Sequence, residues 1–330
     1  MNTASKINVL GDPDAVDSFA ACLSAVMQAW AKNADYATIE ALTGLAFSPC
    51  YNKSEECVGW MMDGESAHRI DFIGRALGFA AERHELSEPL EGADVEAYRA
   101  SGTLPLCAQA YFDHIHQSMV QGKMILVETW PAWSVLTGWN EDLTQLPFST
   151  TPGFEPVVSR IYPPIRARTS FILTNTSSVA DPAQICRETI RFGADIASGK
   201  IALAQNTFGG AMYETIVSVS RQEHMCPGCQ ESGCLGRTFK RMHDGQQASI
   251  AFLSAAGPFI DGPENNKRLN TAIGYYSELR DLTAGYLDWA STEKKRDQPA
   301  FRRQLADDFT RAKALHDAAA EQLLSLAASI

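Results

Sequence analysis

The 330-residue chain has no long hydrophobic run. A membrane-spanning helix needs about 20 consecutive apolar residues, so the sequence excludes one. Residues 1–11 hold one lysine and a short apolar patch without a cleavage-site pattern, and we therefore expect no signal peptide and a cytoplasmic protein. A phosphate-binding glycine loop, a Gly-x-Ser-x-Gly motif and a His-Glu-x-x-His motif are also missing, so none of these three motifs carries the function.

Positive charge is scarce as well. Lysine and arginine together number 28 against 39 aspartates and glutamates, which gives a formal net charge of -11. The short basic run 294–296 is flanked by Glu293 and Asp297 and does not extend into a stripe. Because nucleic acids and anionic membranes attract basic surfaces, we expect neither of them as a partner.

The eight cysteines are too few for a disulfide scaffold in a chain of this length. In a cytoplasmic protein, cysteines are core residues, metal ligands or reactive thiols. Cys107 and Cys186 resemble core residues, and Cys50 with Cys57 forms one candidate pair.

The pattern of apolar residues changes near residue 180, where Asp181-Pro182 is typical of a helix start. The predicted domains are therefore 1–180 and 181–330. In the first we expect helices at about 18–32, 36–45, 66–77 and 95–101 and strands at about 124–129, 133–139 and 171–174. In the second we expect helices at about 182–199, 207–222, 236–256, 264–291 and 298–328.

One segment has the form of a catalytic device. Asp17 or Ser18 can cap a helix that begins there, which puts Cys22 in the first turn or so. The unpaired N–H groups and the positive end of the helix dipole favour a thiolate over a thiol at such a position.

The segment 17–23, DSFAACL, resembles the nucleophile segment D-C-G-P-A-C-L of the C39-like branch of papain-fold cysteine peptidases. Residues 122–127 (GKMILV) and 132–140 (AWSVLTGWN) are similar to that group's second signature, a G-x-P-V-I-V strand followed by H-W-V-V-V-T-G-Y-D. The segment 40–47 (EALTGLAF) and the helical second half look like the acyltransferase family of butirosin biosynthesis. The resemblance covers about residues 8–175 and implies an α+β fold, in which a papain-like domain with an antiparallel sheet precedes an all-α helical domain.

Carried over residue by residue, the resemblance puts the nucleophile at Cys22 and the general-base histidine at Ala132. The glutamine that helps to form the oxyanion hole has no counterpart, and Asn175 loosely matches the residue that orients the base. General acid–base help is worth roughly 10²–10⁴-fold in rate, so alanine at the histidine position indicates a degenerate enzyme.

A displaced base is the alternative. His68, His114 and His116 all lie in the first half, and the last two could approach the sheet from a neighbouring helix. The plainer interpretation is that the three histidines are surface or helix-end residues. In the same way, Cys22 could be a small buried hydrophobe, as most free cysteines are.

A second group of ligands lies between two predicted helices. Cys226 and Cys229 flank a Pro-Gly turn, and with Cys234 and either His224 or His243 they could complete a tetrahedral zinc site. The alternatives are a disulfide or free thiols, and a redox dithiol. We expect the three cysteines to be close together in space, because the spacings between them are short.

Aromatic and polar residues gather near the predicted cleft. The candidate ligand-binding residues are Asp17, Trp60, Trp130, Trp133 and Asn175. Tryptophans on a central strand also serve as core residues, and that alternative stays open here.

Three hypotheses about function follow. The leading one is a degenerate papain-like protein that binds a peptide, acyl or small-molecule ligand in the former active-site cleft, alone or as a homodimer. The second is an active thiol enzyme, an acyltransferase or cysteine peptidase, that uses Cys22 with His68, His114 or His116 as base. The third is a metal- or redox-responsive protein that uses Cys226, Cys229 and Cys234.

Overall fold

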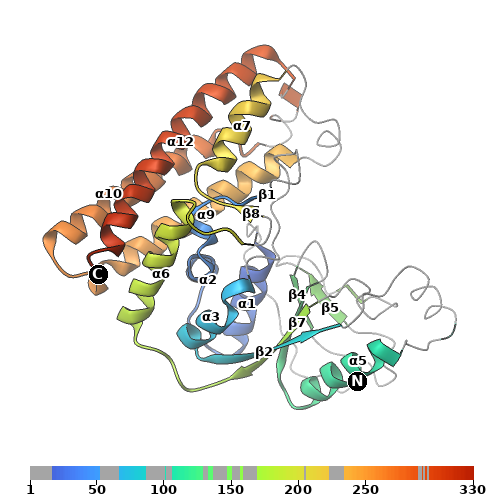
Figure 1. The fold of residues 1–330 in the computed structure, drawn as a ribbon. Coiled ribbons are helices and arrows are strands. Elements are labelled where there is room, and N and C mark those ends of the chain that lie inside the picture. The colour runs from blue at the N-terminus through green and yellow to red at the C-terminus, as the bar shows by residue number, and fades with distance from the viewer. Residues whose placement is uncertain are drawn as a thin grey trace. The chain divides into compact units, whose positions relative to one another are not determined.

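A computed structural model describes residues 17–52, 67–86, 101, 106–128, 133–136, 147–150, 157–158, 169–203, 206–222, 234–288, 292, 294–295 and 297–330. The chain forms two compact units (Figure 1). The first unit is Met1–Ile39 with Asp63–Ala180, and the second is Glu40–Met62 with Asp181–Ile330.

The described residues of the first unit form a six-stranded antiparallel sheet with the strand order β2-β7-β3-β4-β5-β6. In chain order the strands are β2 (Phe79–Glu85), β3 (Met124–Glu128), β4 (Trp133–Leu136), β5 (Pro147–Thr150), β6 (Val157–Val158) and β7 (Thr169–Asn175). This sheet, together with the helices of the chain, confirms the predicted α+β class.

The helices of the first unit are α1 (Ser18–Ala29), α3 (Ile70–Leu77) and α5 (Leu106–Val120), and α2 (Tyr36–Thr43) crosses from the first unit into the second. The helices predicted near 18–32, 36–45 and 66–77 are therefore confirmed, with shorter ends. Strand β2 and helix α5 were not predicted. The helix predicted at 95–101 lies almost wholly outside the described residues.

The two faces of this sheet are covered by different helices. Successive residues of a strand point to opposite faces, and residues paired across strands share a face. On one face, Trp133 of β4 stacks on Phe171 of β7 with 5.5 Å between the ring centroids, and Phe19 of α1 packs edge-on against Trp133. The opposite face carries Ile172 and Leu136, which belong to one buried cluster with residues of α5. Figure 1 shows α1 and α5 on different sides of the strands.

Lys32, which follows α1, binds the C-terminal ends of α3 and β7. Its Nζ donates hydrogen bonds to the carbonyls of Leu77, Gly78 and Thr176. The last carbonyls of a helix have no partner within the helix, and Gly78 ends α3 in the left-handed conformation. The ammonium group therefore satisfies the C-terminal end of α3, and its partial burial lowers the pKa of Lys32.

The described residues of the second unit are mostly helical, and helices are found in each of the ranges predicted between 182 and 328. Its long helices are α6 (Pro182–Ala197), α7 (Ala211–Arg221), α9 (Cys234–Ala256), α10 (Pro263–Ala284) and α12 (Pro299–Ala327). Two 3-10 turns, η1 (Leu45–Phe47) and η3 (Gly257–Phe259), and a two-stranded antiparallel pair of β1 (Tyr51–Asn52) and β8 (Asn206–Thr207) complete the described part.

The segment around η1 is part of the core of the second unit. The ring of Phe47 is fully buried, and the Phe47 carbonyl accepts a hydrogen bond of 2.9 Å from the hydroxyl of Tyr276 on α10. Ser249 of α9 donates to the carbonyl of Ala46 at 2.8 Å. These contacts explain why the segment that begins at Glu40 groups with the second unit, whereas the predicted domain 1–180 includes it. The domain prediction itself stays a prediction.

Two helical glycines of the second unit should respond oppositely to alanine. A Cβ on Gly193 of α6 would lie 2.5 Å from Cδ2 of Phe47, whereas a Cβ on Gly274 of α10 would meet nothing within 4 Å. We expect Gly193→Ala to lower the free energy of unfolding by about 1–3 kcal/mol through overpacking. Gly274→Ala should raise it by roughly 0.5–1 kcal/mol, because alanine is the better helix former. Urea unfolding of both variants checks this, and a stable Gly193→Ala protein would contradict the packing around Phe47.

Buried His316 should make the second unit acid-sensitive. Its Nε2 donates to the Ala197 carbonyl at 3.0 Å, and burial lowers the pKa of His316 from 6.5 to about 4. Between these values the unfolded chain takes up a proton that the folded chain does not, so stability is lost as the pH falls from 6.5 towards 4, by up to about 3 kcal/mol. His316→Gln should flatten this dependence in urea unfolding, and exposed His68→Gln should not. Parallel pH profiles for the wild type and His316→Gln would contradict the assignment.

Candidate functional site

Cys22 lies at the start of the second turn of α1. The residue before the helix, Asp17, is its N-cap, and its Oδ1 accepts a hydrogen bond of 2.8 Å from the N–H of Ala20. The prediction that Asp17 or Ser18 caps the helix is therefore confirmed for Asp17. Asp17 is itself buried, and its N–H donates to the hydroxyl of Tyr36 at 3.0 Å. The carboxylate of Asp17 thus stabilises the start of α1.

The thiol of Cys22 is bound to the main chain of the sheet. The side chain is 1% exposed, and Sγ donates a hydrogen bond of 3.4 Å to the carbonyl of Trp133, the first residue of β4. One turn earlier on the same face of α1, Ser18 Oγ accepts a hydrogen bond of 2.8 Å from the N–H of Trp133. Both main-chain polar groups of Trp133 are therefore bound by side chains of α1. The thiol is thus a hydrogen-bond donor to the main chain.

The ring of Trp133 is a core side chain. It is 1% exposed and lies between Phe19 and Phe171. Trp133 is therefore a core residue and not a ligand-binding residue, because its ring is buried.

The candidate base His114 is on the far side of the sheet from Cys22. Cys22 and Phe19 belong to α1, which packs on the Trp133 face, whereas His114 belongs to α5, which packs on the Ile172 face. His116 is on the same helix as His114, and His68 is an exposed residue ahead of α3. The structure therefore does not bring His114 together with Cys22.

Asn175 is also remote from Trp133. Trp133 of β4 pairs with Glu128 of β3. The register of β3 with β7 puts Glu128, and therefore Trp133, level with Thr169 of β7. Asn175 is six residues further along β7 and is exposed. At about 3.4 Å per residue, it lies roughly 20 Å along the strand from the level of Trp133. It cannot orient a base there.

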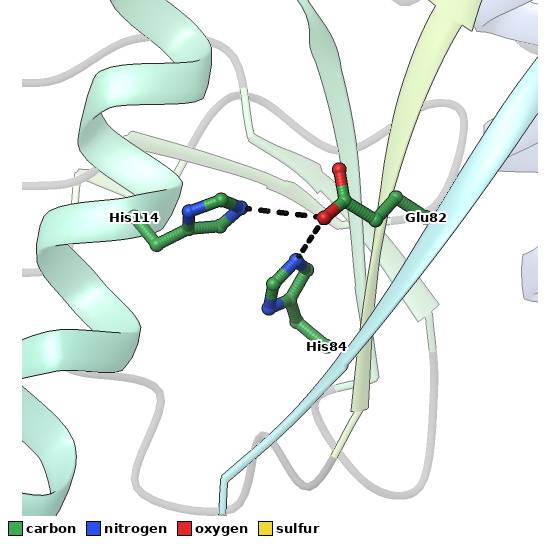
Figure 2. A group of neighbouring side chains, drawn as sticks. All are labelled: Glu82, His84 and His114. Carbon is green, nitrogen blue, oxygen red and sulfur yellow. Dashed lines mark hydrogen bonds and ion pairs between the residues drawn. The ribbon is translucent and has the colours of Figure 1, made fainter.

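A group that the sequence did not reveal lies on the α5 face. Glu82 and His84 are two positions apart on β2, so they share a face, and His114 approaches them from α5 (Figure 2). Nε2 of His84 lies 2.9 Å from Oε1 of Glu82, and Nε2 of His114 lies 3.9 Å from the same oxygen. The two imidazole rings are 4.0 Å apart between centroids.

The electrostatics of this group favour an ionised carboxylate. The hydrogen bond from His84 is the main cause that lowers the pKa of Glu82, and the charges of His84, His114 and Lys123 act in the same direction. The three ligand atoms lie within 4.8 Å of one another, and the side chains are partly open to solvent, with exposed fractions of 56%, 27% and 39% for Glu82, His84 and His114. One carboxylate oxygen and two imidazole nitrogens form a ligand set that suits a transition metal ion.

Only one member of this group was singled out from the sequence. His114 was named for a different role, and Glu82 and His84 were not named. The signal was the spacing Glu-x-His, which puts both side chains on one face only if residues 79–85 form a strand. Because β2 was not predicted, the Glu-x-His spacing did not indicate a shared face in the sequence alone.

Several predicted site residues cannot be placed. Trp60, Trp130, Ala132, His224, Cys226 and Cys229 lie outside the described residues, as does the partner predicted for Cys50, Cys57. Cys234 is the first residue of α9, but its side chain is outside the description, and so is that of Cys107. Cys186 is buried as predicted, and burial raises the pKa of its thiol to about 11. The zinc site predicted around Cys226 stays a prediction.

The second unit has a pocket of about 710 Å³ bordered by α10 and α12. Polar and charged residues make up most of its lining, with Arg311 paired to Glu278 at 3.2 Å and the Tyr286 hydroxyl donating to Asp308. Small-molecule sites are mostly apolar with a few polar groups, and this pocket therefore gives weaker grounds for a function than the first unit does.

No helix in the described part of the chain is both long and apolar enough to cross a membrane. A comparison with known protein families gave no match, and a comparison with curated protein sequences gave none either.

The contact of α1 with Trp133 should be a measurable part of the stability. We expect Ser18→Ala to lower the free energy of unfolding by about 1–3 kcal/mol, because it leaves the buried N–H of Trp133 without its acceptor. Ser177→Ala, at an exposed position, is the matched control and should stay within about 0.5 kcal/mol of the wild type. Urea unfolding of the two variants measures the difference. Equal stability of both variants would show that the contact is not formed.

Proposed function

We propose that the first unit is a degenerate papain-like domain that binds a peptide, acyl or small-molecule ligand without thiol catalysis. The observation that carries the proposal is the hydrogen bond from Cys22 Sγ to the carbonyl of Trp133. Trp133 directly follows Ala132, the position that matches the family's catalytic histidine. The helix that carries Cys22 thus contacts the strand that follows the position matching the base, and the thiol is used as a donor to the main chain.

The arrangement of helices and sheet adds support. A helix with the cysteine packs against one face of an antiparallel sheet, and the resemblance implies an antiparallel sheet for the papain-like domain. The alternative of an active thiol enzyme needs a base close to Cys22. His114 and His116 belong to α5, which covers the other face, so neither of them supports this alternative, and His68 remains its candidate base.

The ligand follows from the resemblance and not from a contact. Papain-like peptidases and the related acyltransferases handle peptides and acyl groups, and a cleft that has lost its base can still bind such molecules. The third hypothesis, which uses Cys226, Cys229 and Cys234, depends on residues outside the described part, and it remains a separate prediction.

Cys22 should be an unreactive thiol in the native protein. Cys22 is buried and hydrogen-bonded, so the native protein must open before iodoacetamide can reach the thiol. We therefore expect alkylation of Cys22 to be at least about 100-fold slower in native than in urea-unfolded protein. Mass spectrometry of the peptide that contains Cys22 gives both rates from the same sample.

An acyl thioester tests the other half of the proposal. It should raise the melting temperature of the wild type and of Cys22→Ala equally, since binding to the native state stabilises it without needing the thiol. The intact mass of the wild type should not change. Faster alkylation in the native protein, or an acyl adduct that is absent from Cys22→Ala, would contradict the proposal and favour the thiol enzyme.

A further inference from the structure

We propose that Glu82, His84 and His114 form a binding site for a divalent transition metal ion, zinc in the first place, on the α5 face of the sheet. The site is distinct from the cysteine-based zinc site predicted around Cys226, because it uses oxygen and nitrogen ligands in the first unit. It is also independent of the proposed ligand binding at the former active-site cleft, since Cys22 lies on the opposite face.

The spacing of the three ligand atoms suits a zinc ion. Zinc bonds of about 2.0–2.2 Å in a tetrahedral site put two ligand atoms roughly 3.3–3.6 Å apart. The Oε1 of Glu82 lies 2.9 Å from Nε2 of His84 and 3.9 Å from Nε2 of His114, so the two distances lie on either side of this value. The two Nε2 atoms lie within 4.8 Å of each other, so all three ligand atoms are close enough to contact one ion after small adjustments.

The surroundings of His114 Nε2 also favour a bound ion. Its Nε2 is shielded from solvent and has no hydrogen-bond partner in the described structure, although the ring as a whole is half-exposed. Buried polar atoms of native proteins nearly always have a partner. Figure 2 shows this nitrogen directed at the carboxylate of Glu82, across the gap that an ion would occupy. A metal ion supplies the missing partner.

The helix and the strand that carry the three ligands are held in place by packing and by strand pairing. His114 lies between Phe112 and Ile115 in sequence, and both of these are in the buried cluster that fixes α5 to the sheet. Glu82 and His84 are held by the ladder of β2 with β7, opposite Ile172 and Ser170. Metal sites built on rigid strands and helices keep their geometry better than sites on loops.

The ligand chemistry selects the class of ion. Imidazole nitrogens suit zinc, copper, nickel and iron, whereas calcium and magnesium prefer sites made of oxygen ligands alone. Three protein ligands leave the fourth position of a tetrahedral ion for water. The partly open side chains allow that position to face solvent.

The test uses the full chain with Cys226, Cys229 and Cys234 all replaced by serine, so that thiolate binding is removed. After chelator treatment and dialysis, titration calorimetry with ZnCl₂ should find one ion per chain. His84→Gln and His114→Gln in this background should each weaken binding by more than about 100-fold, beyond the loss expected for an outer-sphere partner. His116→Gln, on the same helix, and Glu85→Gln, on the same strand but the opposite face, are the matched controls and should bind as before.

A second measurement needs no variant at the site. In NMR spectra of the same serine-substituted protein, zinc should shift the ring signals of His84 and His114 and leave those of His116 in place. Absence of zinc binding in the serine background would overturn the proposal. Binding that survives both His84→Gln and His114→Gln would overturn it too. Neither result bears on the reactivity of Cys22, so this proposal and the proposed function can fail separately.

Discussion

Side chains of an antiparallel strand alternate between the two faces of its sheet, and this alternation organises the chemistry of the first unit. Trp133 and Phe171 point to the face that α1 covers, and Leu136 and Ile172 point to the face that α5 covers. The thiol of Cys22 and the imidazoles of His84 and His114 are consequently separated by the sheet. No rotation of these side chains can bring them together, because the strands between them are tied by the main-chain ladder.

The contact of α1 with β4 has a second consequence. A papain-like nucleophile needs a thiolate at a helix start and a base on the facing strand. Here Ser18 and Cys22 bind the N–H and the carbonyl of the same residue, Trp133, and the helix is thereby fixed in register with the strand. Ser18 and Cys22, which lie in the segment that resembles the family pattern, are thus used to bind the main chain. The proposed metal ligands on the other face lie outside that pattern.

The sequence predicted the parts of the fold that have a strong local signal. Asp17 and Asp181 marked the starts of α1 and α6, and the long helices of the second unit followed from their apolar spacing. Strand β2 was missed because Phe79–Glu85 has no β-branched residue and is half polar, so nothing in its composition distinguishes it from a loop. The grouping of Glu40 and Phe47 with the second unit depends on Arg241 and Tyr276, which are about 200 residues away in sequence, and no local pattern contains that information. The candidate metal group was missed for a similar reason, since it needs both the register of β2 and the position of α5.

We infer that the Cys22 thiol is a hydrogen-bond donor to the main chain and not an activated nucleophile. Raman spectroscopy in the S–H stretching region measures this directly, in a difference spectrum of wild-type protein minus Cys22→Ala. We expect an S–H band at a lowered frequency, typical of a hydrogen-bonded thiol, that persists unchanged from pH 6 to pH 9. Absence of the band at pH 7 would show that Cys22 is a thiolate and would contradict this inference.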